Sequence, residues 1–194
     1  MKTENAKSQE STKGADNTPF LEKFFINQLK DMYYAEQQLV KALEEMQRAC
    51  STEELEDAFE DHNRQTARHI KRLEKVFKMV GMEAGAKKCE AMDGLIQEAR
   101  AIIKETKEGT ATRDAALIIA AQKIEHYEIA TYGSLVQLAL TMELDRAAEI
   151  LERTLEEEDE TDRNLTMIAE TYINVQAEQE TPYSWQQKKE LAEA

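Results

Sequence analysis

The scarcity of helix-breaking residues limits the possible folds of this chain more than any other feature. Pro19 and Pro182 are the only prolines, and both lie outside the region in which apolar residues recur at helical spacing. A proline inside a helix removes a backbone hydrogen bond and clashes with the preceding turn. The sequence therefore predicts that most of the region between the two prolines is helical and that the fold class is all-α.

The first half of this region predicts two long helices, because apolar residues recur every three or four positions on one face of each. The first helix is expected to have Thr18 as its N-cap and Pro19 as its first residue, and to end at about Ala49. The second follows a capping-box pattern at 51–54 and is expected to end near Gly81. The short link between them makes the two helices antiparallel.

A long connection precedes the second pair of helices. Residues 81–109 contain several glycines and one shorter amphipathic run, which predicts a crossover that carries a small extra helix. The third long helix is expected to begin at a Thr112 cap and to end at 141–145, and the fourth to end at about Val175. Two helical hairpins joined by one long crossover define the ferritin-like variant of the four-helix bundle.

One folded domain between two tails is expected. Residues 1–17 are polar and lack an apolar cluster that could offset the entropy of ordering them, so they are predicted to form a flexible N-terminal arm. The bundle is expected to occupy 18–176. Residues 177–194 lose the helical periodicity and are predicted to form a C-terminal tail that Tyr183 or Trp185 could anchor.

The charge of the chain excludes some classes of partner. Its 39 acidic and 25 basic residues give a net charge of −14, and such a field is expected to repel nucleic acids and anionic lipid. No run is apolar enough to predict a membrane span or a secretory signal, so a cytoplasmic location is expected. Cys50 and Cys89 are too few to predict a disulfide framework, and reduced thiols are expected.

Each of the four long helices also carries acidic or imidazole side chains on the stripe that should face the core, and these stripes contain no Lys or Arg. Side chains three or four residues apart share a helix face, and mid-helix positions come to one level in an antiparallel bundle. A buried carboxylate is costly unless it is paired, protonated or bound to a metal. The candidate metal ligands are Glu36; His62, Gln65 and His69; Glu125 and Glu128; and Glu158 and Asp162.

Oxygen-rich donors with one or two imidazoles suit iron or manganese better than zinc, so one or two such ions are the expected cofactor. Each residue also has a structural explanation when it is considered singly. Glu36 could lie at the edge of its stripe, His62 and His69 could be hydrogen-bonded core residues, and 156–160 could be a solvated run of charge. The coincidence across four helices favours a shared dimetal site.

Five runs of the sequence carry a family resemblance: LKDMYYAEQQLVKAL, LEDAFEDHNRQTARHIKRLEKVF, CEAMDGL, AAQKIEHYEIATYGSL and TLEEEDETDRNL. Together, over about 20–175, the chain resembles the YciE/YciF family of ferritin-like bacterial proteins. The resemblance implies a rubrerythrin-like bundle, a homodimer and an association with bacterial stress responses. It also implies that Gln65 stands where relatives usually have an acid. The loss of that acid would weaken one of the two metal positions and leave a mononuclear or labile site, unless His69 replaces the lost ligand. By position, the polar core residues of the family correspond to Glu36, His62, Glu125, Glu128, Glu158 and Asp162.

Three functions are left open. The preferred one is redox chemistry at a di-iron or di-manganese site, through peroxide or oxygen consumption or ferrous iron oxidation, as in a peroxidase, ferroxidase or catalase-like enzyme. The chain has no CxxC pair that could supply electrons, so any reductant is expected to be an external electron donor, either another protein or a small molecule. The alternatives are an iron-storage or DNA-protecting cage, and a non-catalytic helical bundle that acts through protein contacts without a stable metal site.

Overall fold

The computed structural model describes residues 18–180, and within this range all regular structure is helical. The all-α fold class is therefore confirmed. The predicted arm at 1–17 and the tail positions Tyr183 and Trp185 lie outside the described residues. The elements are α1 (Phe20–Ala49), α2 (Glu53–Met79), α3 (Glu90–Glu105), α4 (Ala111–Thr141), α5 (Asp145–Ile168), the π-helical turn η1 (Ala169–Ile173) and α6 (Asn174–Gln179).

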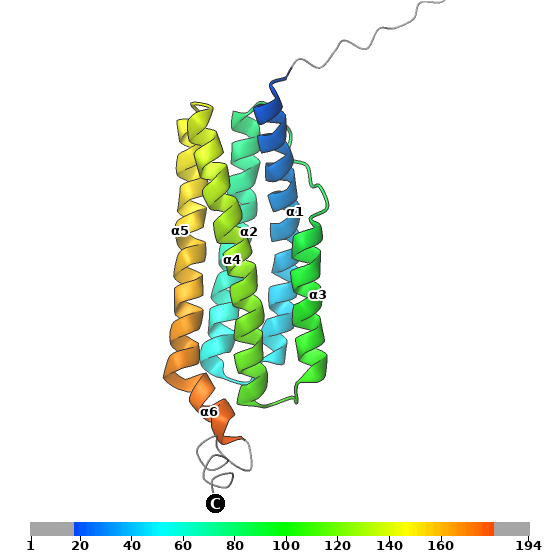
Figure 1. Ribbon diagram of the computed structural model, residues 1–194, viewed down its shortest axis with the longest axis vertical. Helices are drawn as coiled ribbons and strands as arrows, with labels where there is room; N and C mark the ends of the chain where they lie inside the picture. Colours follow the sequence, from blue (N-terminus) through cyan, green and yellow to red (C-terminus); the bar gives the residue numbers. More distant parts are fainter. Residues whose placement is uncertain (1–17, 181–194) are drawn as a thin grey trace, which may run out of the picture.

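Helices α1, α2, α4 and α5 lie side by side along the long axis and form the bundle (Figure 1). Helix α1 packs against α2, and α4 packs against α5, so each predicted hairpin is present. The segment between α2 and α4 descends the length of the bundle and carries α3, which packs on the outside against α1 and α4. This crossover makes α2 and α4 run in the same direction, which confirms the ferritin-like connection.

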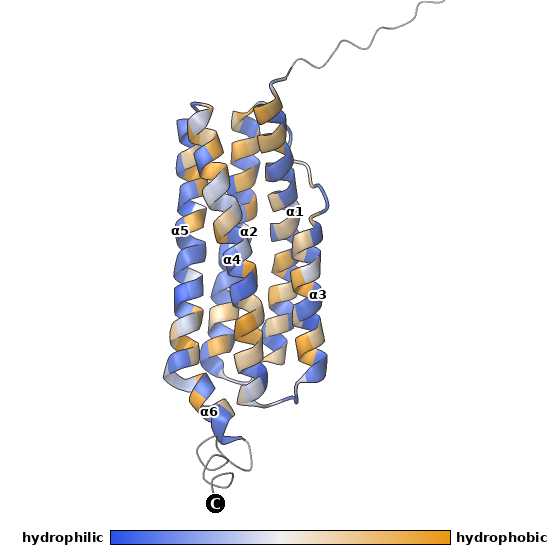
Figure 2. Ribbon diagram, in the orientation of Figure 1, coloured by the Kyte–Doolittle hydropathy of each residue, from blue (hydrophilic) through white to orange (hydrophobic). Residues whose placement is uncertain are grey.

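The core is apolar at both ends of the bundle and polar between them. Along α1, the buried residues Phe25 and Met32 precede the buried Glu36, and Leu39 and Met46 follow it. Figure 2 shows hydrophobic and hydrophilic residues interspersed along the long helices, as expected for helices with one buried face. Burial of apolar side chains contributes roughly 25 cal/mol per Å². The two apolar ends therefore offset the cost of the polar groups that they enclose.

The starts of α2 and α4 differ from their predicted caps. Thr52 occupies the N-cap position of α2, but its side chain makes no capping hydrogen bond. Instead, the Asp114 carboxylate of α4 accepts hydrogen bonds from the backbone N–H groups of Ser51 and Thr52, at 2.9 and 3.0 Å. The capping box predicted at 51–54 is therefore wrong, because an acid from another helix replaces it.

Helix α4 begins two residues earlier than the predicted Thr112 cap would place it. Thr110 is the N-cap, and its Oγ1 accepts a hydrogen bond from the Arg113 backbone N–H at 3.2 Å. Thr112 lies inside the first turn and donates its hydroxyl to Glu180 at 2.7 Å. The Glu180 carboxylate also accepts the backbone N–H of Ala111, so it neutralises the positive end of the helix dipole.

Two helix ends also differ from the expected positions. Pro19 occupies the N-cap position of α1, and the helix begins at Phe20 rather than at the proline. At the other end, helical structure continues through η1 and α6 to Gln179, beyond the predicted end at Val175. Among residues 18–180, no helix combines the length and apolar composition that a bilayer crossing requires.

Candidate metal centre

Six of the eight candidate ligands meet in the middle of the bundle. All four long helices contribute, and every one of the six side chains is buried, with at most 2% of its surface exposed. Helix periodicity explains the convergence, since each residue replaces an apolar side chain on a stripe that already faces the core. The six residues are Glu36 from α1, His62 and His69 from α2, Glu125 and Glu128 from α4, and Glu158 from α5.

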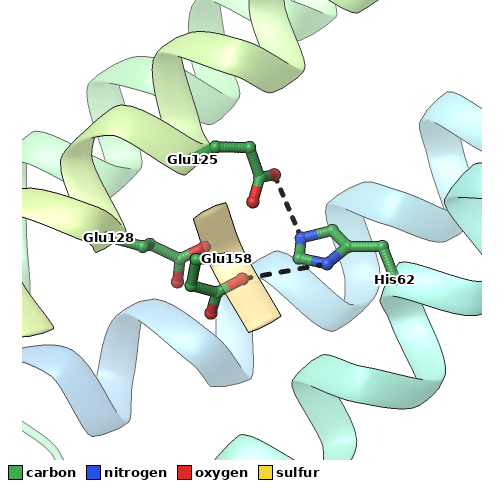
Figure 3. Close-up of side chains that lie close together, drawn as sticks. All are labelled: His62, Glu125, Glu128 and Glu158. Carbon is green, nitrogen blue, oxygen red and sulfur yellow. Dashed lines mark ion pairs between the residues drawn. The ribbon is translucent and has the colours of Figure 1, made fainter. Parts of the chain in front are cut away.

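The first group within the centre contains His62, Glu125, Glu128 and Glu158. One ligand atom from each lies within 4.8 Å of those of the other three. Figure 3 shows the carboxylates of Glu125 and Glu158 each directed at a different nitrogen of the His62 ring. The Nε2 atom of His62 lies 3.1 Å from Oε1 of Glu125, and its Nδ1 atom lies 4.0 Å from Oε2 of Glu158. One divalent ion could be held by this group.

The second group contains Glu36, His69 and Glu158, and its ligand atoms also lie within 4.8 Å of one another. The Nδ1 atom of His69 lies 2.9 Å from Oε1 of Glu158 and 3.6 Å from Oε1 of Glu36. Glu158 belongs to both groups. Its carboxylate could therefore bridge two neighbouring ions, as carboxylates do in dimetal bundles.

The six side chains are short of hydrogen bonds. Among the described residues, the buried side-chain nitrogen and oxygen atoms without a hydrogen bond all belong to these residues, apart from Oγ1 of Thr52. Both oxygens of Glu125, Glu128 and Glu158 and both ring nitrogens of His62 are in this state. Native proteins leave few buried polar atoms without a partner, and a bound metal ion would satisfy such a cluster. The donor set therefore fits iron or manganese.

The pKa values show how protein groups alone balance the charge. Burial lowers the pKa of His62, but the carboxylates of Glu125 and Glu158 raise it to about 9. Burial likewise opposes protonation of His69, whereas Glu158 and Glu36 raise its pKa to about 11. Without a metal, both imidazoles thus carry a proton at neutral pH. A metal ion would have to displace these protons before it could bind.

Two of the carboxyl groups also retain protons more strongly than usual. Burial, followed by the charges of Glu36 and Glu158, raises the pKa of Glu128 well above its ordinary value. Burial also raises the pKa of Glu158 to about 7, against the opposing effect of His69. Such shifts are common where several acids share one buried site.

Tyr132 supports the centre from α4. It is fully buried, and its hydroxyl donates a hydrogen bond to Oε1 of Glu36. Its ring also meets the His69 ring edge-on, with 6.5 Å between the ring centroids. Burial and the charge of Glu36 raise the pKa of Tyr132 well above its ordinary value, so the hydroxyl keeps its proton and remains a donor.

Glu157 contacts the centre, although the sequence pattern does not reveal it, because it lies in the 156–160 run that suggests a solvated face. Its Oε2 lies 2.8 Å from Nε2 of His69, and its carboxylate binds the Arg72 guanidinium at 2.6 and 2.9 Å. Burial works against ionisation, but the hydrogen bonds from Arg72 and His69 lower the pKa of Glu157 to about 2. The sequence does contain one indication of this contact: His69 and Arg72 are three residues apart, so they share a helix face and can bind the same carboxylate.

Two candidate ligands do not join the other six. Oδ1 of Asp162 accepts a hydrogen bond from Gln122 at 3.2 Å and lies 3.4 Å from Nε2 of the exposed His126. Asp162 belongs to neither group of ligand atoms. Gln65 is half-buried, and its Oε1 accepts a hydrogen bond from the Thr161 hydroxyl at 3.2 Å.

A surface cavity of about 480 Å³ reaches the centre between α2 and α5. His62 lines this cavity and is the one residue of the six that does so. The other polar lining residues include Asp61, Gln65, Thr161 and Asn164. A small polar molecule or a cation could therefore approach the His62 side of the centre from solvent.

A bundle of four helices, each of which contributes buried carboxylates or imidazoles to one central site, is the architecture of the ferritin-like proteins. Residues 20–178 match the family described as a domain of unknown function, DUF892. The chain is also 46% identical over 166 residues to Protein YciF of Escherichia coli strain K12. The matched region covers 84% of this chain and 98% of that protein. The chain therefore belongs to the DUF892 family, and E. coli YciF is one of its relatives.

Solved structures agree with this assignment. The crystal structure of the E. coli stress protein YciF matches with a TM-score of 0.75 and 46% identity, over 79% of this chain and 97% of that chain. YcfI from Rhodopseudomonas palustris, for which a structural role has been suggested, matches with a TM-score of 0.76 and 35% identity, over 80% and 98%. A Xanthomonas campestris protein, at 20% identity and a TM-score of 0.65, shares the fold.

Proposed function

We propose that this protein binds two ions of iron or manganese and carries out redox chemistry in a bacterial stress response. The observation that carries the proposal is the meeting of six buried His and Glu side chains from four helices, most of whose polar atoms make no hydrogen bond. The stress response is taken from the description of the E. coli relative as a stress protein.

The charge of the six residues supports two ions rather than one. The four carboxylates of Glu36, Glu125, Glu128 and Glu158 would balance two divalent cations when they are ionised, with His62 and His69 as neutral donors. We assign His62, Glu125 and Glu128 to one position, Glu36 and His69 to the other, and Glu158 to both.

Bound iron or manganese supplies the redox chemistry, because such ions can exchange electrons with peroxide, dioxygen or ferrous iron. The protein residues bind the ions, orient them and control access. Tyr132 orients Glu36 through its hydrogen bond, and the apolar core at both ends of the bundle excludes water. The cavity beside His62 admits small molecules.

Where the proposed activity consumes a reductant, the electrons must come from outside the chain. Cys50 and Cys89 are the only cysteines of the sequence, and 39 positions separate them, so no internal CxxC electron carrier is present. We therefore propose that any electron donor is another protein or a small molecule. We also propose a cytoplasmic location, from the absence of a signal-like or membrane-spanning run in the sequence, and a homodimer, from the family resemblance; light scattering would measure the size of the assembly.

Metal analysis of the purified full chain tests the function. The protein should retain iron or manganese or, once metal-free, bind two equivalents of Fe²⁺ or Mn²⁺ under anaerobic conditions. The Fe²⁺-loaded protein should then develop a ligand-to-metal absorption band on addition of hydrogen peroxide. Glu128→Ala should lose an ion, whereas Glu156→Ala, an exposed change on α5, should not. A folded protein that binds neither metal would refute the proposal.

A second candidate is a helical bundle that acts through protein contacts alone. It is favoured by the ion pairs between His62 and Glu125 and between His69 and Glu158, which partly balance the centre without any metal. This candidate predicts that neither Fe²⁺ nor Mn²⁺ raises the unfolding temperature. Stabilisation by about 2.7 kcal/mol at a hundredfold excess of metal over its dissociation constant would exclude it.

A further inference from the structure

The two nitrogens of the His69 ring face different surroundings. Nδ1 points into the centre, 2.9 Å from Glu158 and 3.6 Å from Glu36. Nε2 points away from it and lies 2.8 Å from Oε2 of Glu157, which belongs to neither group of ligand atoms. An ionised carboxylate can only accept a hydrogen bond, so Nε2 must carry the proton in this contact. Nδ1 is then the nitrogen that is available to a metal.

Arg72 fixes the carboxylate that makes this contact. Its two terminal nitrogens donate to the two oxygens of Glu157 at 2.9 and 2.6 Å, and Nη1 also lies 3.3 Å from the Thr154 hydroxyl. A forked guanidinium pair restricts both the position and the plane of a carboxylate. The side chains of Arg72 and Glu157 are only 16% and 22% exposed, so solvent competes weakly for these bonds.

His62 has no comparable support. Its Nε2 lies 3.1 Å from Glu125 and its Nδ1 lies 4.0 Å from Glu158, so both nitrogens face carboxylates of the centre itself. Within residues 18–180, neither nitrogen has a hydrogen bond to an outer residue. The two proposed metal positions are therefore built differently, because only one imidazole is oriented from outside.

We propose that Glu157 and Arg72 are positioning residues, which hold the His69 ring with Nδ1 directed at the metal position formed with Glu36 and Glu158. The inference rests on the proposed function and adds a difference between its two ions. A carboxylate that accepts the outer N–H of a ligating histidine fixes its tautomer and raises its basicity. Loss of Glu157 therefore weakens the His69 position and leaves the His62 position intact.

The test titrates the metal-free full chain with Mn²⁺, with bound and free ion counted by electron paramagnetic resonance. In Glu157→Ala, one of the two ions should bind about 10–100-fold more weakly, and the other should keep its wild-type affinity. Glu157→Gln, which retains an acceptor oxygen for the His69 N–H, should show a smaller loss. Glu156→Gln removes the same charge from an exposed neighbour on α5 and should bind as wild type.

A second readout separates positioning from a merely structural role. In the Co²⁺-loaded wild type, proton magnetic resonance should show a paramagnetically shifted, exchangeable ring N–H signal that is absent from His69→Gln. Its exchange with solvent should be slow in the wild type and in Glu156→Gln, and fast in Glu157→Ala. Circular dichroism of the metal-free variants confirms that they fold.

The outcomes distinguish the two proposals. If the folded wild type binds no Mn²⁺ or Co²⁺, the proposed function fails. If the wild type binds two ions and Glu157→Ala binds both with wild-type affinity, only the positioning role is overturned. An equal loss at both positions in a folded Glu157→Ala variant would also overturn it, since the geometry links Glu157 to His69 alone.

Discussion

The carboxylate of Glu158 and the imidazole of His69 face one another at the centre of the bundle, with Oε1 of the acid 2.9 Å from Nδ1 of the ring. The second oxygen of Glu158 faces His62 at 4.0 Å. One residue on α5 thus contacts both histidines of α2, and both groups of ligand atoms include it. This shared position makes Glu158 the most informative residue to change.

Glu158→Gln should reduce the binding of both ions, whereas Glu125→Gln should reduce the binding of one. The reason is that Glu125 belongs only to the group around His62, and an amide is a poorer ligand than a carboxylate. Metal content per chain, measured after loading with Mn²⁺ and gel filtration, distinguishes the two variants. Two tightly bound ions in Glu158→Gln would contradict the shared role.

Glu128→Leu should stabilise the metal-free protein and abolish its stabilisation by metal. Both oxygens of Glu128 are buried without a hydrogen bond, and an unsatisfied buried polar group costs about 1–3 kcal/mol. The free energy of unfolding in urea, with chelator and then with Mn²⁺, measures both effects. A variant that is less stable without metal and still gains stability from Mn²⁺ would show that Glu128 has a structural role instead.

The metal-free protein should lose stability as the pH rises from about 6.5 to 9. The folded protein holds the His62 proton up to a pKa of about 9, above the ordinary histidine value of 6.5. The native state therefore binds more protons than the unfolded state in this window, and the free energy of unfolding falls as the pH increases. The raised pKa of Glu158, about 7, adds a loss of the same sign from about pH 4.5 to 7.

Urea unfolding at several pH values in the presence of chelator checks this dependence. His62→Gln should make the profile less steep between pH 6.5 and 9, where His69, with its pKa of about 11, contributes the slope that remains. In contrast, the affinity for Mn²⁺ should increase with pH over the same range, because fewer protons must be displaced. A metal-free protein whose stability is constant from pH 6.5 to 9 would contradict the assigned protonation of His62.

Asp114→Ala should destabilise the fold by about 2–4 kcal/mol, since it removes a buried charged acceptor and leaves the N–H groups of Ser51 and Thr52 without their partner. Glu54→Ala is the matched control, because Glu54 would be the acid of the predicted capping box but is exposed. It should cost less than about 0.5 kcal/mol. If thermal or urea unfolding showed that the two variants lose equal stability, the result would support the local capping box and contradict the role of Asp114.

Helical periodicity is sufficient to predict the long helices, the crossover and the six residues that meet. It could not separate Glu158 from Asp162, because residues four apart share a helix face but differ in level by about 6 Å along the axis. That difference places Asp162 beside Gln122 and outside both groups. Periodicity therefore predicts which face of a helix a residue occupies, but it does not predict which residues that side chain will contact.

The residues that periodicity missed depend on contacts between distant helices. Glu157 lies beside the core-facing Glu158, and only its bonds to Arg72 and His69, on α2, distinguish it from the exposed acids of the same run. Asp114 replaces a local cap in the same way, across the gap between α4 and the start of α2. Local patterns do not encode such partners.

Anomalous diffraction from crystals of the full chain grown with Mn²⁺ tests the central claim most directly. Two peaks should appear inside the bundle, one among His62, Glu125 and Glu128 and the other between Glu36 and His69, with Glu158 in contact with both. An interior without an anomalous peak, in crystals of folded protein at saturating Mn²⁺, would contradict the account.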